Sequence, residues 1–177
     1  MKTETTKNII KFQSYKFAFE RMEEAIQKEF FLESIMIAES IISDRLLSYL
    51  VVRLKEAGET HQFTNKETFL GRLIQEWKKW GEKVPYTTRE DLIDAVRLWS
   101  YDRNECAHGL VKSRPGEPTT SVEEFVKKAS DCAVNGKQLA RDVCSWTQSK
   151  KSKLKKTKVQ SSESIDTPKK SAVSDLI

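Results

Sequence analysis

Apolar residues recur every three or four positions along most of the chain, the spacing expected when one face of an α-helix packs inward. Two long runs of this kind span residues 12–28 and 29–57, and the second ends at Gly58, a residue type common after helix C-termini. The stripe of the first run consists of Phe12, Tyr15, Phe19, Met22 and Ile26. The stripe of the second run includes Ile35, Ile42, Leu46, Leu50 and Leu54. We therefore predict two helices, each with one buried face.

Three further helices are predicted from capping patterns, in which a Ser or Thr is followed three residues later by Asp or Glu. These patterns are Thr64-x-x-Glu67, Thr88-x-x-Asp91 and Ser121-x-x-Glu124. The first introduces a short helix that ends near Gly81, and the last introduces a helix to about Trp146. Trp77 and Trp80 stand at helical spacing on the short helix, so we expect them to pack on the bundle. The prediction is an all-α fold, a four-helix bundle with one additional short helix.

Two charged residues fall on these apolar stripes. Glu39 lies on the stripe of the second helix, between Ile35 and Ile42, and Arg103 continues the stripe of the helix that follows Asp91. Burying either charge alone would cost roughly several kcal/mol, whereas a guanidinium and a carboxylate can satisfy one another. We therefore expect Glu39 and Arg103 to be in contact.

The chain divides into one domain, residues 1–148, and a segment of different composition, residues 149–177. Of the 177 residues, 38% are hydrophobic, enough for a single core. From residue 149 onward there is no aromatic residue or methionine, and eight lysines stand against three acidic residues. This charge of +5 equals that of the whole chain, so the preceding domain is neutral. We expect a disordered basic tail, with salt-sensitive contact to RNA phosphates as the functional alternative.

The most informative motif is Arg103-Asn104-x-x-x-His108, followed directly by Gly109. An arginine is always charged and a histidine titrates near neutral pH, so the two can support phosphodiester cleavage without a metal. This segment resembles the HEPN family, small helical bundles marked by an Arg, often followed by Asn, and then a His. The resemblance implies a metal-independent endoribonuclease, commonly a homodimer, of a toxin or phage-defence type with a possible inhibitory or regulatory partner protein. In that comparison Arg103 would stabilise charge on the phosphate, His108 would move the proton, Asn104 would orient His108 or contact phosphate, and Glu39 would hold Arg103.

Helical geometry separates the two central residues of this motif. On a regular helix His108 shares the side of Asn104, whereas Arg103 projects about 140° away from His108. Either Gly109 ends or distorts the helix there, or a second subunit completes the site. Three alternatives stay open: Arg103 and His108 are structural only, the domain is a non-catalytic dimerisation or partner-binding module, or the tail makes the protein a sequence-blind RNA binder.

No cofactor or metal site is predicted. Cys106 and His108 are two positions apart and would point about 200° apart on a helix, so they cannot share one metal ion. The three cysteines form no Cys-x-x-Cys pair, which is typical of reduced thiols in the cytoplasm. The longest apolar stretch, residues 30–54, contains five charged residues, too many for a transmembrane helix. We therefore predict a cytoplasmic protein without membrane association.

Overall fold

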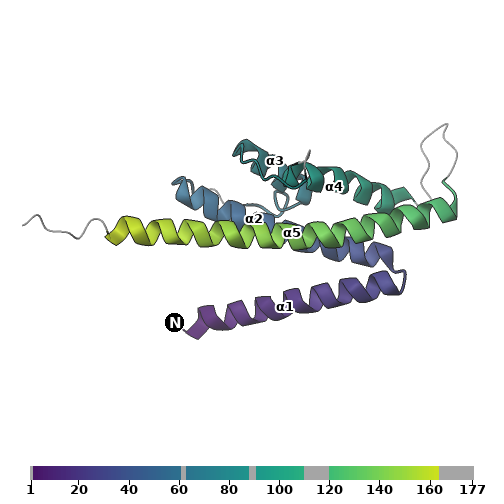
Figure 1. Ribbon diagram of the computed structural model, residues 1–177, viewed down its shortest axis with the longest axis horizontal. Coiled ribbons are helices and arrows are strands. Elements are labelled where there is room, and N and C mark those ends of the chain that lie inside the picture. Colours follow the sequence, from purple (N-terminus) through teal and green to yellow (C-terminus); the bar gives the residue numbers. More distant parts are fainter. Residues whose placement is uncertain (1, 61–62, 88–90, 110–119, 164–177) are drawn as a thin grey trace, which may run out of the picture.

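The computed structural model describes residues 2–60, 63–87, 91–109 and 120–163, with side-chain surroundings defined from residue 9 to residue 150 within these ranges. Within these ranges five helices follow one another (Figure 1). They are α1 (Lys2–Gln27), α2 (Phe31–Glu56), α3 (Leu70–Lys79), α4 (Leu92–Gly109) and α5 (Val122–Glu163). The described residues contain no strand beyond one isolated bridge between Pro85 and Asp91, so the predicted all-α class is confirmed.

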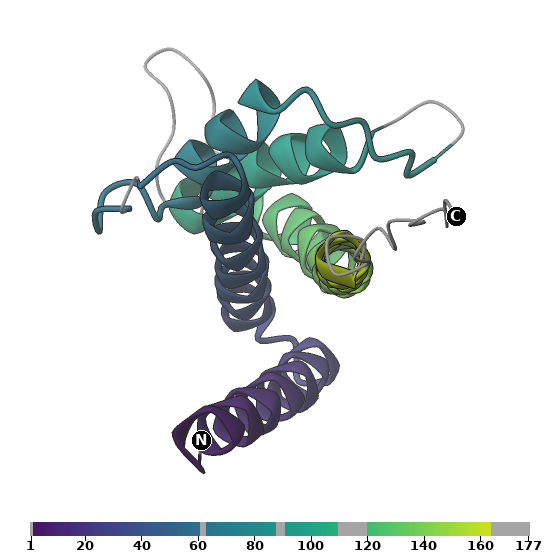
Figure 2. The same ribbon diagram turned by 90° about the vertical axis from the view of Figure 1, so that its left-hand side faces the viewer.

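Helices α2 and α5 form the centre of the molecule and make its most extensive interhelical contact. Helix α4 packs along α5, and α3 lies on α2 and α4. Helix α1 lies on the other side of α2, away from α3 and α4 (Figure 2). The buried residues along α2 include Ile35, Ile42, Leu46, Leu50 and Leu54, which are the residues of the predicted stripe. This stripe is therefore confirmed as the inner face of α2.

An aromatic cluster closes one end of the core. Trp77 of α3 stacks on Trp146 of α5 with ring centroids 4.5 Å apart, and Tyr49 of α2 meets the same indole at 4.6 Å. The Tyr49 hydroxyl donates to Glu82, whose other carboxylate oxygen accepts from Lys150 of α5. The predicted packing role is confirmed for Trp77, which is fully buried, and Trp80 packs against the core with part of its ring exposed.

The helix ends agree with the sequence where a local capping interaction decides them. Gly58 has a φ of 76°, a value that glycine adopts without strain, and it ends α2 as expected. At the start of α5, Ser121 and Glu124 exchange the predicted pair of side-chain hydrogen bonds, at 3.1 and 3.3 Å. The Asp91 carboxylate caps α4 by accepting from the Ile93 amide at 2.9 Å. Thr88, the predicted first residue of that pattern, lies outside the described residues.

Four expectations for the helices were wrong. Helix α1 begins at Lys2, not near residue 12. Phe12 is 70% exposed and does not belong to the buried face of α1. Helix α3 begins at Leu70, because Thr64 and Glu67 close a separate turn through their own hydrogen bonds. Helix α2 begins at Phe31, after a turn in which Glu29 has a φ of 59°.

The last helix is also longer than expected. Helix α5 continues past Trp146 to Glu163, so residues 149–163 of the segment expected to be disordered are helical. Apolar periodicity stops near Trp146, but lysine and serine residues do not by themselves end a helix, and no Pro or Gly interrupts the chain before Pro168. Residues 164–177 of the predicted tail lie outside the described residues. Within the described part, none of the helices is both long and apolar enough to cross a membrane.

Candidate active site on helix α4

The predicted contact between Glu39 and Arg103 is present. Arg103 Nη2 of α4 donates to Glu39 Oε1 of α2, in an ion pair whose side chains are only 20% and 26% exposed. The pair joins two helices that otherwise touch little, because α4 packs mainly on α5. Arg103 Nε is buried and finds no hydrogen-bond partner among the described residues. The guanidinium is therefore held mainly by its Nη atoms.

Asn104 forms the second contact of this guanidinium. Arg103 Nη1 donates to Asn104 Oδ1 at 2.8 Å, so Arg103 lies between the Glu39 carboxylate and the Asn104 carbonyl. The amide group of Asn104 is exposed and its nitrogen has no hydrogen-bond acceptor among the described residues. This arrangement orients Arg103 through two acceptors and leaves the Asn104 amide available to a ligand.

His108 occupies a different environment. It is exposed in the last turn of α4, one turn after Asn104, and makes no hydrogen bond or ion pair to another described residue. The helix includes Gly109, so this glycine does not distort α4 in a way that would turn His108 toward Arg103. The two side chains therefore lie on different sides of one helix, about 140° apart around its axis. The structure brings Glu39, Arg103 and Asn104 together and leaves His108 outside that group.

Two neighbouring residues extend the exposed face of α4 that carries Asn104 and His108. Arg97 and Tyr101 precede Asn104 by seven and three positions, which places all four on one side of the helix. The Arg97 guanidinium lies 5.9 Å from the centroid of the Tyr101 ring, which is 54% exposed. The Tyr101 hydroxyl raises the pKa of Arg97, with a smaller contribution from Asp94. Our sequence reasoning did not select this pair, although its helical spacing was readable.

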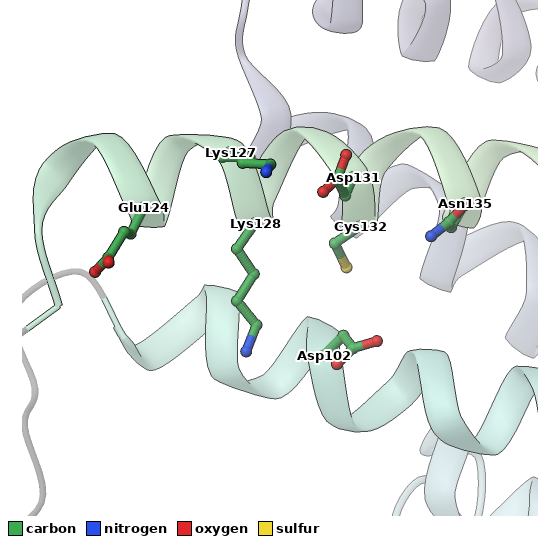
Figure 3. Close-up of a pocket in the computed structure, with 7 residues that line it drawn as sticks. All are labelled: Asp102, Glu124, Lys127, Lys128, Asp131, Cys132 and Asn135. Atoms are coloured by element: carbon green, nitrogen blue, oxygen red, sulfur yellow. The ribbon is translucent and has the colours of Figure 1, made fainter.

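A shallow cleft of about 290 Å³ lies between α4 and α5 (Figure 3). Its lining residues are charged or polar for the most part: Asp102, Glu124, Lys127, Lys128, Asp131, Cys132 and Asn135. Lys128 reaches across to pair with Glu105 of α4. Neither Arg103 nor His108 lines this cleft, so it is distinct from the predicted catalytic residues.

Metal-ligating residues do not gather elsewhere in the described chain. No group of three or more His, Cys, Asp or Glu side chains in residues 9–150, apart from the gaps, is placed to hold a metal ion. Comparison with protein-family models, curated proteins and solved structures finds no match to this chain. The resemblance to the HEPN family therefore depends on the Arg103-Asn104-x-x-x-His108 motif and on the helices around it.

Proposed function

We propose that this protein is a HEPN-like, metal-independent endoribonuclease that acts as a homodimer. The observation that carries the proposal is the environment of Arg103, a guanidinium held by Glu39 and Asn104 on the helix that also carries the exposed His108. A guanidinium needed only to neutralise Glu39 would not require the second contact with Asn104. Because it is oriented before any ligand arrives, it can bind a phosphate without first paying for its own ordering.

The proposed reaction uses the ribose 2′-hydroxyl as the nucleophile. His108 removes the proton from this hydroxyl, and the oxygen attacks the adjacent phosphorus. The bond from phosphorus to the 5′-oxygen breaks, and this oxygen takes up a proton from water. Arg103 stabilises the negative charge that develops on the phosphate oxygens, and the amide of Asn104 donates to one of them. The products are a 2′,3′-cyclic phosphate and a 5′-hydroxyl end. DNA lacks the 2′-hydroxyl and resists cleavage.

A homodimer supplies the geometry that one chain lacks. Arg103 and His108 project from different sides of α4, so a phosphate near Arg103 is reached by the histidine of a second copy across a two-fold axis. A separate apolar surface lies on α1, away from α4, with Phe12 70% and Phe17 67% exposed. The same surface favours the second candidate function, a non-catalytic module that dimerises or binds a partner protein.

The exposed pair on α4 provides further contacts for RNA in this proposal. A single-stranded RNA that lies along this face places a base on the Tyr101 ring, while Arg97 contacts phosphate. The setting we propose is a cytoplasmic toxin or phage-defence system with an inhibitory or regulatory partner protein.

The test is cleavage of labelled single-stranded RNA in excess EDTA, with analysis of the product ends. His108→Ala and Arg103→Lys should each lower the cleavage rate by at least about 100-fold, because one removes the base and the other the bidentate guanidinium. His61→Ala, which removes the chain's other histidine, is the matched control and should cleave like wild type. Circular dichroism confirms that each variant is folded.

Two outcomes would contradict the proposal and assign the alternatives. Equal cleavage by folded His108→Ala and wild type would remove His108 from the mechanism. Alternatively, the wild-type protein could bind RNA without cleaving it, and deletion of residues 151–177 could abolish that binding. This result would identify a nucleic-acid binder that uses its lysine-rich segment. This truncation keeps Lys150 and its ion pair with Glu82.

A further inference from the structure

Two cysteines meet inside the interface between α4 and α5. Cys106 of α4 and Cys132 of α5 are 1% and 3% exposed, and each influences the pKa of the other. Both are free thiols. The third cysteine, Cys144, lies farther along α5 near Arg45 and belongs to a separate environment. The chain thus contains one thiol pair that spans two helices and one isolated thiol for comparison.

The two helices approach closely at this point because α5 presents small residues. A Cβ atom built on Gly136 would lie 2.7 Å from Cζ2 of Trp99, so the indole of α4 fills the space that a side chain would take. The same indole donates from Nε1 to the Cys132 carbonyl at 2.9 Å, and the small residues Ala129 and Ala133 of α5 are also buried. Figure 3 shows the Cys132 thiol directed from α5 toward α4. A disulfide needs Cβ atoms about 3.5–4.5 Å apart, and two cysteines buried in so close a helix interface are suited to such a link.

The thiols differ in their acid–base properties. The hydrogen bond from Cys132 lowers the pKa of Cys106, assisted by the Lys128 ammonium and opposed by burial. The same hydrogen bond raises the pKa of Cys132, and burial raises it further. Cys106 is therefore the better thiolate and the better nucleophile, and Cys132 is the proton donor of the pair. Once Cys106 is oxidised, Cys132 no longer donates to a thiolate and can lose its proton more readily.

A small oxidant can approach the pair from solvent on the side of Cys132, because Cys132 lines the cleft between α4 and α5 and Cys106 does not. The cleft of about 290 Å³ between α4 and α5 is lined by Cys132 and by the lysines at positions 127 and 128. Hydrogen peroxide is similar in size to water, which occupies about 30 Å³ in the liquid, so the cleft can admit it. Bulkier oxidants such as glutathione disulfide are a poorer match to so shallow a space.

We propose that Cys106 and Cys132 are a peroxide-sensitive thiol pair that closes to a disulfide joining α4 to α5. The Cys106 thiolate attacks one oxygen of hydrogen peroxide, the O–O bond breaks, and the leaving hydroxide takes up a proton to become water. The Cys132 thiolate then attacks the sulfenic acid sulfur of Cys106, and the sulfenic oxygen leaves as a second water. Two thiols and one peroxide give one disulfide and two waters, and a thiol reductant reverses the change.

The cross-link bears directly on the segment that carries the candidate active site. Cys106 lies between Arg103 and His108, so the disulfide ties the last turns of α4 to α5 and restricts any movement of α4 needed to seat a ligand. The redox pair itself stands on the contact of the two thiols and does not depend on ribonuclease activity.

The experiment treats the folded full-length protein with hydrogen peroxide and maps its peptides by mass spectrometry without reduction. We expect a peptide pair linked through Cys106 and Cys132, lighter than the two free peptides by two hydrogen atoms and restored by dithiothreitol. This link should form at least about tenfold faster than Cys144 reacts. Because the native chain is used, the result does not depend on any variant folding. Peroxide-treated protein that keeps Cys106 and Cys132 reduced while Cys144 is oxidised would overturn the proposal.

Variants then test the assigned order of attack. In Cys132→Ala the sulfenic acid of Cys106 has no thiol to resolve it and should be trapped by dimedone, whereas Cys106→Ala should give no labelling at position 132. Cys144→Ser is the matched control and should form the same cross-link as wild type. A Cys144→Ser protein that fails to form the link, or a link from Cys106 to Cys144 in wild type, would contradict the pairing.

Discussion

The inner and outer faces of helix α4 are built for different purposes. The inner face carries Trp99, Cys106 and Arg103, each with a partner on α2 or α5. The outer face carries Tyr101, Asn104 and His108, which are exposed. The Arg103-Asn104-x-x-x-His108 motif therefore spans both faces, with Arg103 partly buried and His108 exposed. Substitutions of packed residues on the inner face should therefore change stability more than substitutions of exposed residues on the outer face.

The sharpest test of this comparison is a mixture of two inactive variants. If Arg103 of one subunit works with His108 of the other, a heterodimer of Arg103→Lys and His108→Ala keeps one complete site. Random reassortment of the subunits should then give a cleavage rate of about a quarter of the wild-type rate, whereas each variant alone should be at least about 100-fold slower than wild type. Each variant alone, taken through the same unfolding and refolding, is the control. A mixture that stays inactive would place Arg103 and His108 of one chain in the same site.

On the inner face, removing the partner of Arg103 should destabilise the fold. Glu39→Ala leaves a largely buried guanidinium without its carboxylate, and the expected loss is about 1–2 kcal/mol in the free energy of unfolding. Glu39→Gln keeps an acceptor of the same shape and should lose less. The measurement is urea unfolding followed by circular dichroism. Equal stability of Glu39→Ala and wild type would mean that the ion pair contributes nothing to the packing of α4.

A smaller loss is expected where α4 approaches α5 most closely. Gly136→Ala places a methyl group against the Trp99 indole, which is held by its hydrogen bond to the Cys132 carbonyl. Overpacking of about 1–3 kcal/mol is offset by the better helix propensity of alanine, about 0.5–1 kcal/mol, so the net loss should be about 1 kcal/mol. Gly71→Ala on α3 is the control, because open space surrounds that position. Gly71→Ala should be neutral or stabilising. If Gly71→Ala lowered the free energy of unfolding more than Gly136→Ala, the close approach of α4 and α5 at Gly136 would be contradicted.

The smallest effect is expected on the outer face. Asp94 near the start of α4 pairs with Lys78 and Arg97, and the hydrogen bond from Lys78 is the main reason that its pKa is lowered. Because the pKa of Asp94 is lower in the folded state than in the unfolded state, its ionised carboxylate stabilises the fold at pH values above the unfolded-state pKa of about 3.9. This stabilisation is lost as the pH falls from that pKa to the lower folded-state pKa. Because the carboxylate is exposed to solvent, Asp94→Asn should cost less than about 0.5 kcal/mol at neutral pH. A stability profile from pH 7 to pH 2 should be slightly flatter in the variant than in wild type, and an identical profile would show that the pairing is not formed in solution.

The sequence was a good guide wherever a residue's neighbours along the chain decide its place. The α2 stripe and the contact of Glu39 with Arg103 follow from three- and four-residue periodicity, and the helix ends at Gly58 and Ser121 follow from local capping signals. Helix ends that lack a stop signal were harder to predict from the sequence. The end of α5 was expected near Trp146, but the helix continues to Glu163. The thiol pair and the Arg97–Tyr101 pair depend on which helices pack side by side and on which face stays exposed, and periodicity alone does not contain that information.

The position of α5 at the end of the described chain has a consequence for how the protein is made. Its buried residues, among them Ala133, Ala140 and Val143, cover the apolar face of α2, and Trp146 completes the aromatic cluster. Synthesis proceeds from the N-terminus, so α1 to α4 leave the ribosome with that face still open to water. Folding of the domain must therefore wait until α5 has emerged, and a chain stalled before residue 122 would be a substrate for chaperones and not a smaller folded protein.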